Sequence, residues 1–328
     1  MDTLHPQVHA GPGRPADLSD DVELIAADVT HGPSWQTTLK LVRPDIIVHL
    51  AAETGTGQSL TEASRHGLVN VVGTTQMLDA LSAIGHVPER FVLASSRAVY
   101  GEGAWRSDDG TIFYPASRPH AQLEASRWDP LTPNGGAAHS MASVAGITPP
   151  NPSNIYAATK LTQEHVLNAW SAAMGSAVST LRLQNVYGPG QSLTNSYTGV
   201  VALFARLSAA SKPIEVYEDG VILRDFVHVG DVVSALEAAA TATSPGGVLT
   251  DIGSGQPSTI FEVASVLAKL AGAPEPVVSG RFRDGDVRAA HCSIDNAREV
   301  LGYVPAWSVE AGLRSLLDWV IATETTAG

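Results

Sequence analysis

Short apolar runs alternate with longer segments of helical periodicity along this 328-residue chain. Near-continuous runs of apolar residues are typical of parallel strands that are covered on both faces. Four such runs are predicted as buried strands: 22–29, 45–52, 90–96 and 178–186. Helical patterns occupy 59–84 and 156–174, the second with Ser153 or Asn154 as its cap, and an amphipathic helix is expected near 308–323. Strands that alternate with helices in this way indicate β/α units and a doubly wound parallel sheet.

The segment 102–152 interrupts this pattern and is rich in Pro, Gly, Ser and Ala. A loop of roughly 50 residues is too long for a simple connection, so we expect a lid or a subdomain insert there. Beyond residue 190 the strands and helices become shorter. The expected organisation is therefore α/β, with a Rossmann-like domain over 1–190 that contains the insert, and a smaller α+β substrate-binding part over 191–328.

Composition narrows the class of partner. A formal net charge of −13 without a run of Lys or Arg makes nucleic acid or an anionic membrane an unexpected partner. Mean hydropathy is +0.06, and no stretch reaches the roughly 18 apolar residues of a membrane span. The single cysteine, Cys292, excludes an internal disulfide and favours a reducing cytoplasm. The eleven histidines show no metal-ligand spacing, so no metal is expected.

The candidate chemistry is centred on Tyr156 and Lys160, which are four residues apart and therefore share one face of a helix. A tyrosine acts as a general base near neutral pH only if its pKa falls from about 10, and a neighbouring ammonium lowers it. Many surface helices carry both residues, so the spacing alone is weak. Its position adds weight, because the helix follows a predicted strand that ends in Ser95 and Ser96. Ser96 is placed to hydrogen-bond the same substrate hydroxyl.

Nine short segments follow one another in the order of a known family. They are D-T-L at 2–4, A-D-V at 27–29, H-L-A-A at 49–52, V-N-V-V-G-T at 69–74, S-S-R-A-V-Y-G at 95–101, Y-A-A-T-K at 156–160, L-R-L-Q-N-V-Y-G-P-G-Q at 181–191, R-D-F-V-H-V at 224–229 and R-D-G-D-V-R at 283–288. The chain thus resembles the extended short-chain dehydrogenase/reductase family, the NAD-dependent epimerases and dehydratases of nucleotide sugars. The segments 4–9, 53–59 and 195–199 resemble the subgroup of dTDP-L-rhamnose 4-epimerases.

The resemblance implies roles for individual residues. The catalytic residues would be Ser96, Tyr156 and Lys160. Contacts with NAD would come from Asp2, Asp28, Val29, Ala51, Ala52, Asn70, Tyr156 and Lys160. Contacts with the nucleotide-diphosphate sugar would come from Ser96, Asn185, Arg224, Arg283 and Asp286. An acidic residue at Asp2 favours NAD over NADP, because it would repel a 2′-phosphate. The resemblance also implies a homodimer that pairs through 59–84 and 156–174.

The glycine-rich segment that holds the NAD pyrophosphate in this family is not found. Of three glycine runs, 11–16 contains two prolines and follows no strand, 55–60 lacks the third glycine, and 253–258 lies far along the chain. We therefore expect a Rossmann-like domain that lacks its first strand and helix. On that reading the 328-residue chain should neither hold NAD tightly nor turn over substrate.

Several activities remain open at this point. The first is a nucleotide-sugar 4-epimerase, an isomerase that works through a transient 4-keto sugar, with a dTDP-6-deoxyhexose as substrate. A 4,6-dehydratase is the second, although related dehydratases carry an Asp-Glu pair where this chain has Arg97 and Ala98. A ketoreductase could use the same catalytic residues. The alternative of another class is a non-catalytic, truncated or pseudoenzyme protein that binds nucleotide sugars.

Overall fold

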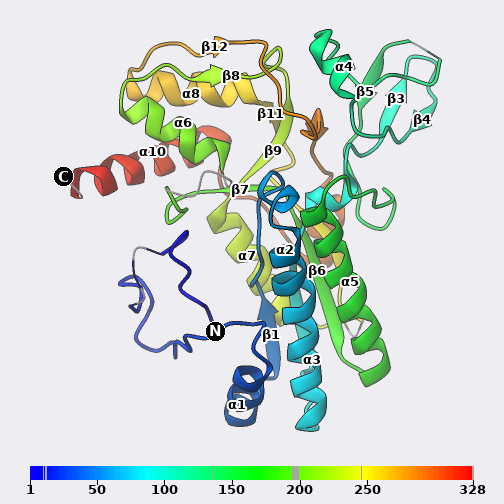
Figure 1. Cartoon of the computed structure of the whole chain (residues 1–328), viewed down its shortest axis with the longest axis vertical. Helices are drawn as coiled ribbons and strands as arrows, with labels where there is room; N and C mark the ends of the chain where they lie inside the picture. The colour runs from blue at the N-terminus through cyan, green and yellow to red at the C-terminus, as the bar shows by residue number, and fades with distance from the viewer. Residues whose placement is uncertain (10, 12, 135, 194–198, 245, 327–328) are drawn as a thin grey trace.

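A parallel four-stranded sheet forms the centre of the molecule (Figure 1). The computed structural model describes residues 1–9, 11, 13–134, 136–193, 199–244 and 246–326. The sheet has the order β1-β2-β6-β10, and all three pairings are parallel. Its strands are β1 (Ile46–His49), β2 (Arg90–Ser96), β6 (Ala177–Leu183) and β10 (Leu249–Ile252). The predicted α/β class with a parallel sheet is confirmed.

Helices cover both faces of this sheet. One face carries η1 (Gln58–Leu60), α2 (Ala63–His66), the π-helical η2 (Gly67–Val72), α3 (Gly73–Ala83), α5 (Ile155–Met174) and α1 (Gly32–Val42), and the other carries α7 (Val229–Thr241) and α9 (Asp295–Leu301). The predicted helix 59–84 is therefore a helical run over 63–83. Asn154 caps α5, because its Oδ1 accepts a hydrogen bond from the Ala157 amide at 2.9 Å. Phe91 and Leu93 of β2 pack against Met77 and Leu81 of α3 in the core beneath these helices.

The predicted strand at 22–29 is wrong. Only Ala26 pairs with a neighbouring segment, in an isolated parallel bridge to Asp2. Two backbone hydrogen bonds hold this bridge, from the Asp2 amide to the Ile25 carbonyl and from the Ala27 amide to the Asp2 carbonyl. A strand requires a ladder of partner groups, and one bridge supplies too few. Val29 is nevertheless buried in the core, which explains the apolar pattern.

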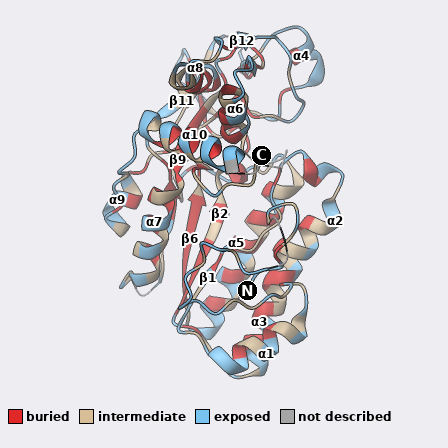
Figure 2. Cartoon of the chain, turned by 90° about the vertical axis from the view of Figure 1, so that its left-hand side faces the viewer, coloured by how far each residue is buried: buried red, intermediate tan, exposed pale blue. Residues whose placement is uncertain are grey.

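The predicted strand at 178–186 is split at Gln184. Residues before it belong to β6, whereas β7 (Asn185–Tyr187) leaves the central sheet and pairs with β9 (Leu223–His228). Figure 2 colours β6 as buried along most of its length. In contrast, β1 has a single partner, β2, within the part of the chain that the structure describes. Ile46 and Val48 of β1 remain exposed.

The described residues of 102–134 and 136–152 form a small lobe beside the main body (Figure 1). It contains a three-stranded antiparallel sheet in the order β4-β3-β5. The elements are β3 (Trp105–Ser107), β4 (Ile112–Phe113), α4 (His120–Glu124) and β5 (Ala138–Ser140). Arg118 fixes the lobe to the C-terminal part, because its two terminal nitrogens donate to the Glu218 carboxylate at 2.9 and 2.8 Å. Arg288 donates to the same carboxylate at 3.0 Å, so the buried acid is shared by two cations.

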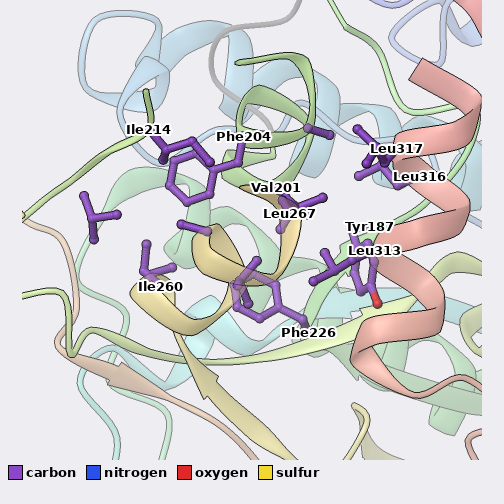
Figure 3. Packing of buried hydrophobic residues seen from close by; sticks show 14 of the residues in the cluster. Tyr187, Val201, Phe204, Ile214, Phe226, Ile260, Leu267, Leu313, Leu316 and Leu317 are labelled. Carbon is purple, nitrogen blue, oxygen red and sulfur yellow. The ribbon is translucent and has the colours of Figure 1, made fainter. Parts of the chain in front are cut away.

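The C-terminal part has its own core, in which helices pack on short strands (Figure 3). The strands are β8 (Glu215–Val216), β9, β11 (Pro257–Thr259), β12 (Val277–Val278) and β13 (Ala289–Ala290), and the helices are α6 (Val200–Ala209), α8 (Ile260–Ala271) and α10 (Val309–Thr326). Phe204, Leu267 and Leu313 come together from α6, α8 and α10. Each such burial contributes roughly 1.5–3 kcal/mol. The same stretch of chain also returns to the central sheet. β10 is one of its strands, and α7 and α9 cover one of its faces.

Candidate active site

Ser96, Tyr156 and Lys160 line one cavity of 560 Å³ at the carboxyl end of the central strands. Ser96 is the last residue of β2, and its Oγ caps the short helix η3 (Arg97–Tyr100) by accepting from the Ala98 amide at 3.1 Å. Tyr156 and Lys160 lie in the first two turns of α5, one turn apart. The structure therefore brings the three predicted catalytic residues together. Ligands of open α/β sheets usually bind at this end of the strands.

The expected lowering of the Tyr156 pKa is wrong for this structure. Burial raises the pKa of the phenol above its usual value, while a hydrogen bond with Ser96 and the charge of Arg97 oppose the rise. From the four-residue spacing, we expected the Lys160 ammonium to lower the pKa of Tyr156. The structure gives that influence to Arg97, and the penalty of placing an anion away from water outweighs it.

Lys160 is a buried ammonium that is 2% exposed. Burial lowers its pKa to about 8, and Glu164, one turn further along α5, opposes that shift. Its ammonium donates no recorded hydrogen bond to another residue of the described chain. Glu164 is occupied elsewhere, because it accepts from Arg182 Nε and Nη2 at 3.0 and 2.7 Å. The donors of Lys160 therefore remain available to a ligand in the cavity.

The residues predicted to hold adenosine are spread along the irregular N-terminal segment. Asp2 is exposed, and its Oδ1 accepts from the Leu4 amide at 2.7 Å. Asp28 is also exposed and accepts from the Thr30 amide at 2.8 Å. Val29 is a core residue. Among the residues that follow β1, Ala52 lines the cavity and Ala51 packs against the core.

Asn70, a further predicted NAD contact, lies in the interior and is fully buried. Its Oδ1 accepts from the Glu53 amide at 2.7 Å, and its Nδ2 donates to the Glu53 carbonyl at 3.0 Å and to Thr159 Oγ1 at 2.9 Å. These bonds join the loop after β1 to the start of α5. Asn70 thus fixes the wall of the cavity rather than lining it.

Of the further residues predicted to contact the substrate, Asn185 lines the cavity, whereas Arg224, Arg283 and Asp286 do not. Arg224 is buried, with Nη1 and Nη2 donating to the Leu223 and Val287 carbonyls at 2.7 Å each. Arg283 is exposed, and its guanidinium lies 5.1 Å from the centre of the Tyr217 ring. Asp286 is half-buried and affects the pKa of both Arg97 and Arg224. Of the subgroup segment 195–199, residues 195–198 lie outside the described residues.

Arg97 is the site residue that the sequence analysis did not assign. It lines the cavity beside Ser96 and Tyr156, and its Nε donates to Asn185 Oδ1 at 3.2 Å. The available signal was its position directly after Ser96 in S-S-R-A-V-Y-G. No Asp or Glu of the described residues lines this cavity.

The glycine run at 253–255 has a structural role. The amides of Ser254 and Gly255 donate to the Asp225 carboxylate at 2.7 and 3.0 Å, so they are already committed within the protein. Gly55 accepts from the Ser59 amide at the start of η1. The described residues therefore fit the nicotinamide-ribose end of NAD through Tyr156 and Lys160. The Ser254 and Gly255 amides are not available to its pyrophosphate.

Within the described ranges, His, Cys, Asp and Glu form no group of three or more that would hold a metal ion. Over the same residues, no helix combines the length and apolar character needed to span a membrane.

Comparisons with known proteins identify the family of the chain. Residues 135–253 match the model of the NAD dependent epimerase/dehydratase family, and residues 8–121 match that of GDP-mannose 4,6 dehydratase. A dTDP-L-rhamnose 4-epimerase of Burkholderia thailandensis is 54% identical over 320 residues, which cover 98% of this chain and 87% of the relative.

Two solved structures share the fold. The UDP-glucose 4-epimerase of Thermotoga maritima has a TM-score of 0.75 at 24% identity and covers 96% of this chain and 89% of its own. That of Thermus thermophilus, a complex with NAD, has a TM-score of 0.72 at 25% identity and covers 94% and 88%. The 54% identity to the Burkholderia thailandensis relative extends over nearly the whole chain. The chain therefore belongs to the NAD-dependent epimerase/dehydratase family of the short-chain dehydrogenases/reductases.

Proposed function

We propose that this chain is an NAD-dependent 4-epimerase of a nucleotide sugar, with a dTDP-6-deoxyhexose as substrate. The convergence of Ser96, Tyr156 and Lys160 on one cavity carries the proposal. The choice of a dTDP-6-deoxyhexose rests on the relative that is 54% identical. When bound, NAD supplies reversible hydride exchange with C4 of the sugar.

The side chains divide the remaining work. Tyr156 Oη takes the proton of the 4-hydroxyl as the 4-keto sugar forms and returns it when the sugar is reduced. Ser96 Oγ orients the same oxygen by a hydrogen bond. Lys160 Nζ donates to ribose hydroxyls of the bound cofactor. Turning the keto sugar over in the cavity exposes its opposite face, and the product is the 4-epimer.

The lining of the cavity argues against dehydration. Loss of water from C5 and C6 requires a group that protonates the leaving hydroxyl. Arg97 occupies the place of that acid, and no carboxylate among the described residues lines the cavity. The match of 8–121 to the GDP-mannose 4,6 dehydratase model favours a dehydratase as the second candidate.

The test is to incubate the purified chain with dTDP-L-rhamnose and millimolar NAD, and to follow the sugar by proton NMR. High NAD offsets weak cofactor binding by mass action. We expect a mixture of the two C4 epimers, with Tyr156→Phe as the inactive control. Accumulation of a 4-keto-6-deoxy sugar from dTDP-glucose would instead identify a dehydratase. Net oxidation of dTDP-L-rhamnose to a keto sugar with formation of an equal amount of NADH would identify a ketoreductase running in reverse.

The non-catalytic alternative gives a different result in the same experiment. Such a protein would bind dTDP-L-rhamnose in calorimetry and leave it unchanged at every NAD concentration. Failure to bind any nucleotide sugar would contradict both the epimerase and the binding protein.

A further inference from the structure

Arg97 occupies a place in the cavity that the proposed reaction has not yet used. It follows Ser96 directly, begins η3 and lines the same cavity as Tyr156 and Lys160. Its Nε donates to Asn185 Oδ1 at 3.2 Å, which fixes the direction of the guanidinium. Its two terminal nitrogens form no recorded hydrogen bond with the described residues. A guanidinium fixed at Nε presents two parallel donors that match a phosphate.

A second guanidinium lies nearby. Arg224 donates to the backbone carbonyls of Leu223 and Val287 and to no carboxylate of the described chain. Burial, followed by the charge of Arg97, lowers the pKa of Arg224 to about 9. Asn185, which accepts from Arg97, is paired with Phe226 of β9, two residues beyond Arg224, so the backbone also brings the two cations to the same region.

The nearby acids do not neutralise this pair by direct contact. Asp286 and Glu102 act on both guanidiniums through their charge. Glu102 accepts from the Arg288 amide at 2.8 Å and lies 3.5 Å from Arg118, so its carboxylate is already shared. Arg224 is buried and Arg97 is half-buried, and a cation in such a place without a hydrogen-bonded anion is costly, a cost that an anionic ligand removes.

We propose that Arg97 binds the β-phosphate of the nucleotide sugar and thereby selects a nucleoside diphosphate over a monophosphate. This proposal rests on the proposed function, which places C4 of the sugar at Tyr156. The sugar then lies between Tyr156 and the diphosphate, and the β-phosphate is the phosphate nearer to the reacting residues. Arg97, on the wall beside Tyr156, is within reach of that end of the ligand.

The experiment compares dTDP with dTMP by calorimetric titration, without sugar and without NAD. We expect Arg97→Met to weaken dTDP binding roughly ten- to hundredfold, the effect of one lost charge-assisted hydrogen-bond pair, and to leave dTMP binding within about twofold. Arg298→Met is the matched control, because Arg298 is exposed on α9 and its one ion pair among the described residues is with Asp295. It should leave both affinities unchanged.

The outcomes are distinct. Equal dTDP affinity for the wild type and Arg97→Met, or an equal loss for dTDP and dTMP, overturns the role of Arg97. Absence of dTDP binding by the wild type overturns the proposed function instead. If circular dichroism shows that Arg97→Met does not fold, Arg97→Gln replaces it. Glutamine keeps a donor for Asn185 and lacks the charge, so the same selective loss is expected.

Discussion

Glu164 accepts two hydrogen bonds from Arg182, at 3.0 Å from Nε and 2.7 Å from Nη2, one helical turn beyond Lys160. Both side chains are buried, and Ser95 Oγ also donates to the Glu164 carboxylate. The pair joins α5 to β6 directly beneath the cavity. It thereby positions the turn of α5 that carries Tyr156 and Lys160.

Glu164→Gln should destabilise the fold by about 3–5 kcal/mol, because it leaves the Arg182 cation buried without its anion. Chemical denaturation followed by circular dichroism measures the free energy of unfolding. Glu310→Gln is the control, since Glu310 pairs with Arg314 at 3.8 Å on the exposed face of α10. A loss no larger than that of the control would contradict the structural role of Glu164.

Tyr156→Phe should abolish epimerisation and leave the affinity for dTDP nearly intact. The variant loses the phenolic oxygen that exchanges the proton and keeps the ring that lines the cavity. Ser96→Ala should reduce turnover less, because only one hydrogen bond to the reacting hydroxyl is lost. Substantial NMR-detected epimerisation by Tyr156→Phe would show that another group carries the proton.

Elements with a strong local hydrophobic pattern and clear end signals could be predicted from the sequence. β2 coincides with the predicted strand 90–96, and α5 begins one residue before the predicted helix, because both have strong patterns and clear ends. The segment 22–29 shows the same apolar character, yet a pattern does not reveal whether a partner strand lies alongside.

The site could be predicted only in part. The Y-x-x-x-K spacing located Tyr156 and Lys160, but spacing contains no measure of burial. The pKa of Tyr156 was therefore predicted in the wrong direction. The bond between Arg97 and Asn185 joins residues 88 positions apart. The sequence pattern does not predict this contact, because it depends on β7 leaving the central sheet to pair with β9.

The homodimer stays a prediction, and the helical run over 63–83 offers a way to test it. Leu68 and Val72 are 51% and 37% exposed and, being four residues apart, share one face of that run. An apolar face of this kind is expected to pack against a second copy. Light scattering at micromolar concentration should give a dimer for the wild type and a monomer for Leu68→Glu. Leu41→Glu, an exposed site on α1, should remain dimeric, and a monomeric wild type would refute the interface.

Stability should fall as the pH rises from about 4 to about 7, through the titration of Asp251. Burial raises the pKa of this carboxyl from 3.8 to about 7, although Tyr100 and Arg182 oppose the shift. The folded state therefore holds a proton that the unfolded state has already released, so the contribution is complete below pH 4 and lost above pH 7. The shift corresponds to at most about 4 kcal/mol.

Asp251→Asn provides the comparison for this pH dependence. Asparagine still accepts from the Tyr100 hydroxyl, which donates to Asp251 at 2.9 Å, and it does not ionise. The difference in unfolding free energy between variant and wild type should grow in favour of the variant between pH 4 and pH 7. Parallel stability curves would show that Asp251 titrates normally.

NAD should bind this polypeptide more weakly than micromolar. Lys160 and Tyr156 are placed to receive the nicotinamide ribose, whereas the Ser254 and Gly255 amides are already bonded to Asp225. A pyrophosphate is usually held by the amides of a glycine-rich turn at a helix N-terminus. Asp2 and Asp28, both exposed, offer adenosine only peripheral contacts. At NAD concentrations equal to that of the protein, turnover should therefore be absent. Calorimetric titration decides the matter, since a micromolar dissociation constant would require a phosphate site in another segment of this chain.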